Sequence, residues 1–545
     1  MNYSTGKLSF IFMVAVLLSF VGAWWVARRY RVAMRKLMSA PLATPTPAPA
    51  PTRDATAGLP PVTRVAEPGL GPLPEPAPVS AGDNRLAGYR LALLLVALSS
   101  LISLSSAALQ LHVVMAEKTF SFNRLALLGF VQLWPVIPSL GLLWRWSRGR
   151  VLGALALWFV VCFAVVIWRS DGNTALAVLS YLAFEIGPPM LLTAAVCLGG
   201  ATRAIAPWLL LPMIGLVWAS QTGLDLAALM LPHPPGWFLA LIGWLGARPA
   251  MALFALLPWL LAWGPLKLLG RVLARAYARK WLSELMVLFT AVWGISLLAK
   301  ALMAASDLGL GGAVMLLPLA WVPVAMATAR HLGHPRGRPP TLLVLRVFQH
   351  DERIQALFDH VIERWRLTGN TVLIAGTDLV ERTLDADDIF TFIDGRLASR
   401  FIQSPADVAT RLAAFDFVPD ADGRFRINEC YCHDTTWQAA LAALVQRSDV
   451  VLMDLRSFKA HNEGCRHELG VLARASHIRR VVVLTDGDTD RAAALGATEA
   501  APQGRFVWLD TRHPGRAKRR EVLESLFVTP GVAKAPGLTE ALSAA

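Results

Sequence analysis

Polar side chains follow an apolar run in the last third of the chain, where they could act on a bound ligand. The stretch SDVVLMDLRSFKAHNEGCRHELGVLARA covers residues 448–475. Its apolar run ends at Asp454, a polar loop with Ser457 follows, and a segment with helical spacing contains Glu468. A carboxylate at such a place suits acid/base chemistry on a bound ligand.

The position of Glu468 on its predicted helix decides what the carboxylate can do. With Asn462 as N-cap, Cys465, Leu469 and Leu472 form a buried stripe, and Glu468 flanks that stripe. Partial burial raises a carboxylate pKa, which suits general acid/base work or the stabilisation of a cation. The alternative is a half-exposed glutamate that pairs with an arginine of its own helix.

Strands alternate with helices throughout this region. The spacing predicts strands over 341–348, 371–376, 449–454, 480–485 and 505–509, and helices over 351–367, 435–447, 463–475 and 517–527. Continuous apolar strands between helices indicate a doubly wound parallel sheet that is covered on both faces. Ligands bind such sheets beyond the strand carboxyl ends, so Asp351 and Asp378 join Asp454 and Ser457 as predicted substrate-binding residues.

Three short segments resemble the superfamily that joins TIR domains and nucleoside 2-deoxyribosyltransferases. SDVVLMDLRSF is similar to its strand and loop, GCRHELGVLA to its helix, and LRVFQHDER to the opening TIR strand. The resemblance implies a flavodoxin-like fold in which Glu468 stabilises an oxocarbenium-like ribose as a base departs from NAD or a nucleoside. In the deoxyribosyltransferase variant Glu468 is the nucleophile. The segment 377–433 is longer than a typical TIR connection, which leaves the substrate open.

The sequence contains residues that could bind zinc or calcium, but neither metal site is predicted. Soft zinc ligands occur at Cys430, Cys432, His433, Cys465 and His467, but Cys-x-Cys-His lacks the usual Cys-x2-Cys spacing. The run DGDTD at 486–490 begins like a calcium loop, yet Arg491 stands where glycine is required. We interpret Asp488 as a helix N-cap instead. The segment 420–428 is predicted to form a hairpin around its Asp-Gly pair.

The first 335 residues have the composition of a membrane protein. The whole chain is 55% hydrophobic and 17% charged, and residues 1–340 contain 27 Lys+Arg against 10 Asp+Glu. All of the excess positive charge therefore lies in the apolar part, where it sets topology, and no nucleic-acid partner is expected. The apolar runs predict nine spans, at 8–27, 91–116, 125–144, 151–168, 176–200, 207–231, 237–266, 282–300 and 312–329.

Basic residues at the ends of the spans predict their orientation. With the N-terminus outside, most lysines and arginines fall in cytoplasmic connections, and everything after residue 330 is cytoplasmic. The first span could instead be a signal peptide, although the five basic residues directly after it act as a cytoplasmic stop. Residues 41–82 hold 12 of the 35 prolines, which is typical of an extended tether.

Ionisable groups within spans are candidates for function because a charge in lipid is costly. Glu185 precedes Pro188 and Pro189, and Arg248 follows Gly246 within the seventh span. A transporter would use such a carboxylate at a broken helix. The alternatives are a structural Glu185–Arg248 pair, or an Arg248 that marks a helix end.

These observations combine into one hypothesis for the chain. We expect an N-terminal anchor (1–40), a Pro/Ala-rich linker (41–84), a multi-span domain (85–335) and a cytoplasmic TIR-like α/β domain (336–545) in a bacterial inner membrane. The expected partners are membrane lipids, a nucleotide ligand and further copies of the chain, and the expected role is signalling or defence. The alternatives are a non-catalytic sensor or interaction module, and a transporter with a regulatory domain.

Overall fold

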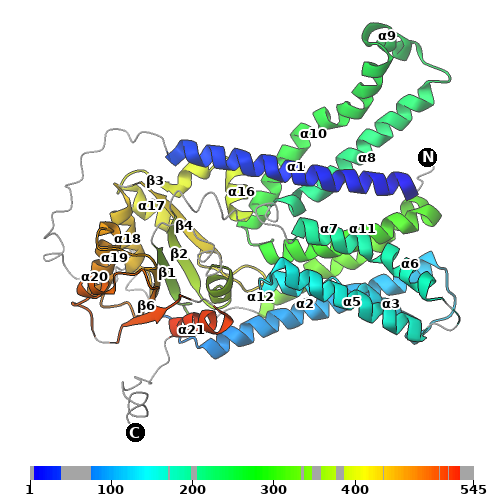
Figure 1. Ribbon diagram of the computed structural model, residues 1–545. Helices are drawn as coiled ribbons and strands as arrows, with labels where there is room; N and C mark the ends of the chain where they lie inside the picture. Colours follow the sequence, from blue (N-terminus) through cyan, green and yellow to red (C-terminus); the bar gives the residue numbers. More distant parts are fainter. Residues whose placement is uncertain are drawn as a thin grey trace.

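The computed structural model consists of a helical bundle and a C-terminal α/β domain, which lie end to end (Figure 1). The amino-terminal end of α1 lies at the end of the bundle that is remote from the α/β domain (Figure 1). The structure describes residues 5–38, 75–169, 172, 174–197, 205–332, 337–346, 358–375, 386–433, 435–502, 504–512 and 515–527.

Long apolar helices form the bundle. They are α1 (Thr5–Met38), α2 (Ala81–Leu109) with the π-helical turn η1 (Gln110–Val114), α3 (Phe122–Gln132), α4 (Val136–Leu143), α5 (Arg148–Arg169), α6 (Ala175–Glu185), α7 (Gly187–Cys197), α8 (Ala206–Met230), α9 (Gly236–Leu245), α10 (Ala247–Ala278), α11 (Glu284–Leu308), the 3-10 helix η3 (Gly309–Ala320) and α12 (Trp321–Leu332). Within the described residues, eight helices are long and apolar enough to cross a membrane, or nine if the bent pair α3 and α4 is one span. Each of the nine predicted spans overlaps one of these.

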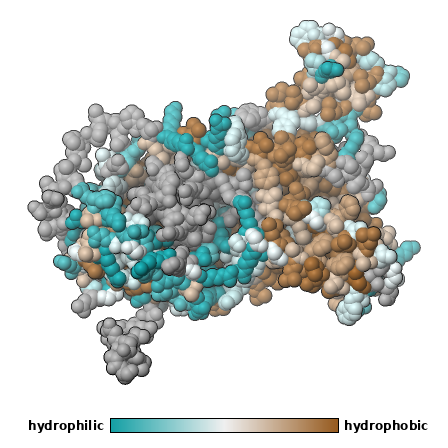
Figure 2. All heavy atoms as spheres, viewed as in Figure 1, coloured by the Kyte–Doolittle hydropathy of each residue, from teal (hydrophilic) through white to brown (hydrophobic). Residues whose placement is uncertain are grey.

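Two of the predicted spans are interrupted in the structure. The span predicted at 237–266 breaks at Gly246, whose φ of +85° ends α9, and the long helix α10 then continues to Ala278. The span at 176–200 breaks after Glu185, just before the proline pair of α7. Apolar side chains cover the visible surface of the bundle, whereas the α/β domain is mostly hydrophilic outside (Figure 2). A surface of this kind is typical of lipid-facing helices.

Seven parallel strands form the sheet of the α/β domain. They are β1 (Thr341–Arg346), β2 (Asn370–Ala375), β3 (Phe401–Ile402), β4 (Ile427–Cys432), β5 (Val450–Asp454), β6 (Arg480–Thr485) and β7 (Phe506–Asp510), in the order β3-β4-β2-β1-β5-β6-β7. The helical segments between and after them are η4 (Phe358–Ile362), α14 (Glu363–Trp365), α16 (Ala386–Ile393), η5 (Leu397–Arg400), α17 (Asp407–Ala413), α18 (Trp437–Gln446), α19 (Glu463–Arg474), α20 (Arg491–Gly496) and α21 (Arg516–Leu526).

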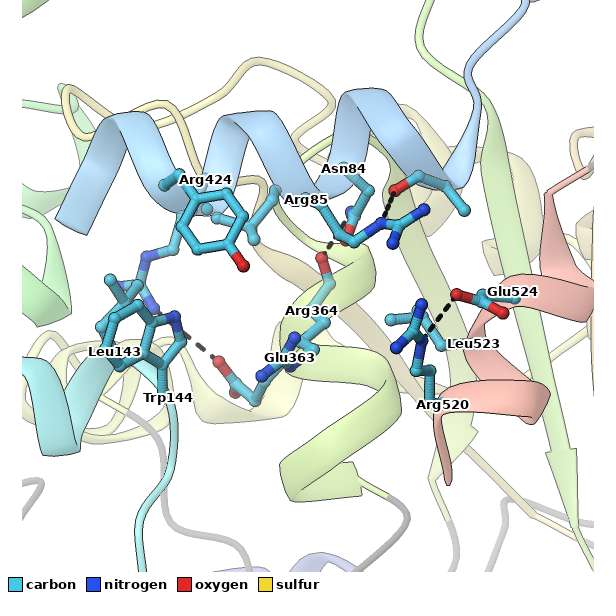
Figure 3. Close-up of a pocket in the computed structure, with 14 residues that line it drawn as sticks. Asn84, Arg85, Leu143, Trp144, Glu363, Arg364, Arg424, Arg520, Leu523 and Glu524 are labelled. Atoms are coloured by element: carbon cyan, nitrogen blue, oxygen red, sulfur yellow. Dashed lines mark hydrogen bonds and ion pairs between the residues drawn. The ribbon is translucent and has the colours of Figure 1, made fainter. Parts of the chain in front are cut away.

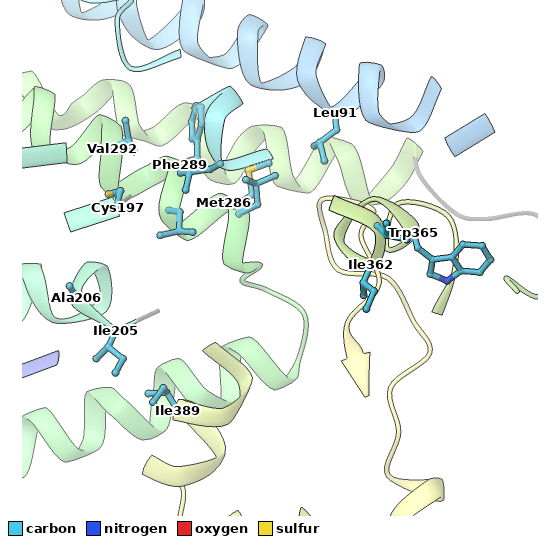
Figure 4. Close-up of a cluster of buried hydrophobic side chains, with 14 of the residues drawn as sticks. Leu91, Cys197, Ile205, Ala206, Met286, Phe289, Val292, Ile362, Trp365 and Ile389 are labelled. Carbon is cyan, nitrogen blue, oxygen red and sulfur yellow. The ribbon is translucent and has the colours of Figure 1, made fainter. Parts of the chain in front are cut away.

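Both faces of the sheet are buried, as the continuous apolar strands predict. Leu343 and Val451 point to one face and pack with α18 and α19. Their neighbours Leu342 and Leu452 point to the other face and share a cluster with Trp365 and α21. That second cluster extends into the bundle, where Figure 4 shows members from α2 and α11 as well as from the domain. The bundle and the domain therefore share one apolar core.

The strand order places a topological switch point between β1 and β5. The chain passes from β1 to β2 on one side, whereas β5 lies on the other side of β1. Without β3 and β4 the order is the flavodoxin-like 2-1-3-4-5, so the long segment 377–433 supplies the two additional strands. The predicted hairpin in this segment is wrong. A tight turn exists at Gly423, but β4 pairs in parallel with β2 and β3.

Polar contacts join the domain to the ends of several bundle helices. Asn84 of α2 donates to the carbonyl oxygen of Arg364 and to Oγ1 of Thr368, both at 2.8 Å. Lys280, just after α10, lies 2.6 Å from Asp416. These contacts orient the sheet relative to the bundle.

Candidate functional site

The loop after β5 lies at the switch point, where a doubly wound sheet binds its ligand. Asp454 ends β5 and is buried. Both of its oxygens accept hydrogen bonds from Arg456, from Nε at 2.8 Å and from Nη2 at 2.6 Å. This fork neutralises the charge of Asp454. Asp454, which was predicted to bind the ribose, is therefore already paired with the guanidinium of Arg456.

Ser457 occupies the same loop with an unusual backbone. Its φ is +61°, which is uncommon for a residue with a side chain and typical of sites where the surrounding structure holds a strained loop. The N–H of Ser457 donates to Oδ1 of Asp486 at 3.0 Å, which ties this loop to the loop after β6. Burial acts to raise the pKa of Asp486, but hydrogen bonds from Ser457, Thr489 and Asp488 outweigh it and hold the pKa below its ordinary value.

Glu468 differs from both of these carboxylates because it is buried without a matching charge. It lies in the second turn of α19 and is 8% exposed. Among the described residues, none makes a hydrogen bond to its Oε2 atom. Burial raises the pKa of Glu468 to about 8, so the free protein holds it mainly protonated at neutral pH. Glu468 was predicted to flank the buried stripe of its helix, but in the structure it is itself part of the core.

Cys465 lies close enough to both Glu468 and Asp454 to be affected by their charges. The thiol lies one turn before Glu468 on α19 and packs against the core of the domain. Burial, and then the charges of Glu468 and Asp454, raise the pKa of Cys465 to about 12. The three groups are thus close enough to influence one another, and the thiol is inert at neutral pH.

The structure describes part of the predicted site. It places Asp454, Ser457 and Glu468 in β5, its loop and α19, on one side of the switch point. Asp351 and Asp378, predicted after β1 and β2, lie outside the described residues. Sequence reasoning missed Arg456 and Asp486 as members of the site. The arginine two residues after the strand-end aspartate is a signal from which Arg456 could have been found.

The structure also describes the residues that could have bound zinc or calcium. Among the residues that the structure describes, no three His, Cys, Asp or Glu side chains are grouped to hold a metal ion. In the DGDTD run the N-cap of α20 is Asp490, which accepts from the N–H of Ala493 at 3.1 Å. The assignment of Asp488 as that N-cap is wrong by two residues, because the turn held by Asp486 and Thr489 comes first.

A second buried carboxylate lies inside the bundle. Glu185 forms an ion pair with Lys300 of α11, and both side chains are 5% exposed. Lys300 also lies 3.4 Å from Oε1 of Gln110, at the start of the π-helical turn η1. Arg248 is exposed in the first turn of α10. The predicted alternative of a Glu185–Arg248 pair is therefore wrong, and Arg248 marks a helix end.

No family model, no curated protein and no solved structure matches the chain.

Proposed function

We propose that the chain is a multi-pass protein of a bacterial inner membrane, with its N-terminus in the periplasm and its α/β domain in the cytoplasm. The long apolar helices of the bundle support this placement. Basic residues support the orientation: Arg145 and Lys280 contact the domain, at the end of the bundle where a cytoplasmic excess is expected. Lys7 pairs with Asp225 elsewhere in the bundle.

In this proposal the α/β domain binds NAD or a nucleoside and cleaves its N-glycosidic bond in a signalling or defence response. The observation that carries the proposal is the Oε2 atom of Glu468. It is buried at the switch-point side of the sheet and accepts no hydrogen bond from any described group. A buried carboxylate without a partner is costly, and it is retained where a ligand supplies the missing charge.

The chemistry requires Glu468 in its ionised form. A cationic ligand, such as the pyridinium of NAD, lowers the carboxyl pKa from about 8 when it binds. The bond between C1′ and the base nitrogen then breaks, and its electron pair leaves with the base. Glu468 stabilises the positive charge that develops at C1′, and water adds to C1′ and releases a proton. In a transferase variant the carboxylate itself bonds to C1′ and a second base displaces it.

Base release from the full-length protein tests this proposal. The purified chain is incubated with NAD and a panel of nucleosides, and released base is separated by chromatography. We expect Glu468→Gln to lower the rate by about 100-fold or more, whereas Glu463→Gln, an exposed change on the same helix, leaves it unchanged. The full chain is used because assembly of several copies is part of the hypothesis.

Two results would overturn the catalytic proposal. If the wild-type protein releases no base from any member of the panel, the domain is a non-catalytic interaction module. If Glu468→Gln releases base as fast as the wild type, another group performs the chemistry. Either result leaves the placement in the membrane intact, because that placement depends on the bundle.

One observation favours a second candidate function, a transporter that uses Glu185. Its ion pair with Lys300 lies where α6 breaks before α7 and next to the π-helical turn η1, and broken helices are typical of transport sites. In vesicles that contain the protein, a proton or ion flux that Glu185→Gln abolishes would support it. Unchanged flux in that variant would leave the ion pair as a structural element.

A further inference from the structure

A cavity of about 350 Å³ lies where the bundle meets the α/β domain. Figure 3 shows its labelled residues arranged around it, from α2 and the end of α4 on the bundle side and from α14 and α21 on the domain side. Because both parts contribute walls, the cavity exists only when the domain is docked. A ligand bound there stabilises the docked arrangement by mass action.

The cavity is positively charged. Its lining includes four arginines and two glutamates: Arg85, Arg364, Arg424, Arg520, Glu363 and Glu524. Both glutamates already have cationic partners. Glu524 accepts from Arg520 at 2.8 Å, and Glu363 lies 2.7 Å from Arg145, a further arginine at the end of α4.

Two of these guanidinium groups remain available for a ligand. Arg85 donates from Nε to the carbonyl oxygen of Ala81 at 3.3 Å, within its own helix. Arg364 offers its carbonyl oxygen to Asn84, and its side chain is exposed. Two guanidinium groups on opposite walls are suited to a phosphate, because each can donate to two of its oxygens.

The face of α2 that leaves the cavity identifies the rest of the ligand. Arg85, Tyr89 and Leu93 follow one another at intervals of four residues, so they share one face over about 12 Å of helix. Tyr89 is 65% exposed and Leu93 is 69% exposed. A guanidinium, a phenol and an aliphatic side chain match, in that order, the phosphate, the glycerol region and the acyl chain of a lipid. A soluble phosphate compound has nothing to place against Leu93.

We propose that this cavity binds the headgroup of an anionic phospholipid. Arg85 and Arg364 hold the phosphate, and the acyl chain runs from the cavity along Tyr89 and Leu93 into the membrane. The lipid then touches the bundle and the domain together, so its presence strengthens the docking of the domain. The site is separate from Glu468, so the lipid proposal does not depend on the chemistry proposed for that residue.

Lipid retention measured by native mass spectrometry tests the proposal. The full-length protein is stripped of lipid in detergent and is then given equal amounts of phosphatidylglycerol and phosphatidylcholine. We expect one phosphatidylglycerol per chain to be retained in preference to phosphatidylcholine. The pair Arg85→Gln/Arg364→Gln should weaken that retention about thirty-fold, since each basic residue contributes roughly fivefold to binding of an anionic lipid. The pair Arg85→Lys/Arg364→Lys, which keeps both charges, should recover part of it.

A matched control removes the same charge elsewhere. Arg28 and Arg90 are exposed and do not line the cavity, so Arg28→Gln/Arg90→Gln should retain the lipid as the wild type does. Equal retention of both lipids, or equal loss in the control pair, would overturn the proposal. Displacement of phosphatidylglycerol by inorganic phosphate or glycerol 3-phosphate would also overturn it, because the site would then recognise a soluble phosphate.

Discussion

Two of the buried carboxylates, Glu185 in the bundle and Glu468 in the α/β domain, are in opposite situations. Glu185 has an ammonium group beside it, and the two side chains are equally buried. Glu468 is buried, and no described residue makes a hydrogen bond to its Oε2 atom. The first charge is compensated within the fold, whereas the second needs either a proton or a ligand. Compensation therefore separates a structural carboxylate from one that is available for chemistry.

Removing the partner of Glu185 should have the largest effect on stability. Lys300→Met leaves a carboxylate inside the bundle without its ammonium, so the free energy of unfolding should fall by about 3–5 kcal/mol. Denaturation of the purified protein in increasing amounts of a denaturing detergent measures this. The double variant Glu185→Gln/Lys300→Met should recover most of the loss. A single variant no less stable than the double one would show that the pair does not hold the bundle together.

Glu468→Gln should have the opposite effect and raise the stability of the α/β domain. The pKa of about 8 lies above the ordinary value of 4.5, so the folded protein keeps a proton that the unfolded chain releases between these pH values. Stability of the domain should therefore decrease as pH rises from about 5 to about 8, and the variant should remove this dependence. At pH 8 we expect the variant to be more stable by roughly 1–3 kcal/mol. Proteolysis of the domain in the full chain, repeated across this pH range, measures it, and parallel pH profiles would contradict it.

Asp454→Asn makes the same chemical change beside Glu468 but on a paired carboxylate. It weakens two hydrogen bonds from Arg456, so the domain should lose about 1–2 kcal/mol at pH 7. The same proteolysis assay compares the two amide variants directly. Stabilisation by both substitutions would show that Asp454 and Glu468 share one uncompensated site, which is contrary to the contacts described above.

Arg248→Gln should have the smallest effect. The side chain is exposed at the start of α10, and such substitutions usually change stability by less than about 0.5 kcal/mol. The detergent denaturation used for Lys300→Met provides the comparison. A loss as large as that of Lys300→Met would mean that Arg248, and not Lys300, compensates a buried charge.

Local patterns in the sequence predicted most of the elements. The helix predicted over 463–475 is α19 at Glu463–Arg474, and the strand over 480–485 is β6 with the same bounds. Helical spacing predicted that Cys465 faces the core and that Glu468 flanks it; Cys465 is half-buried against the core, and Glu468 is more deeply buried than predicted. The Asp-Gly pair correctly predicts a turn, but the pairing of the next strand depends on β2 and β3, which no local pattern contains.

Local patterns in the sequence do not predict contacts between residues that are far apart in the chain. Lys300 lies 115 residues from Glu185, and it is the last residue of the span predicted at 282–300. The apolar run shows where a span lies but not its depth within one or two turns, and the helix in fact continues to Leu308. The predicted site residues Asp351 and Asp378 stay predictions.

The hydrogen bonds of Asn84 imply an order of assembly. Its side chain, in the first turns of α2, bonds to Arg364, which is synthesised 280 residues later. At roughly 5–20 residues per second, the ribosome needs on the order of 10–60 s to supply that partner. Over this interval the helices of the bundle are synthesised while the Asn84 side chain still lacks its partners in the domain. Docking of the domain on α2 therefore follows synthesis of the whole bundle, and a chain that stops before residue 364 cannot form this contact.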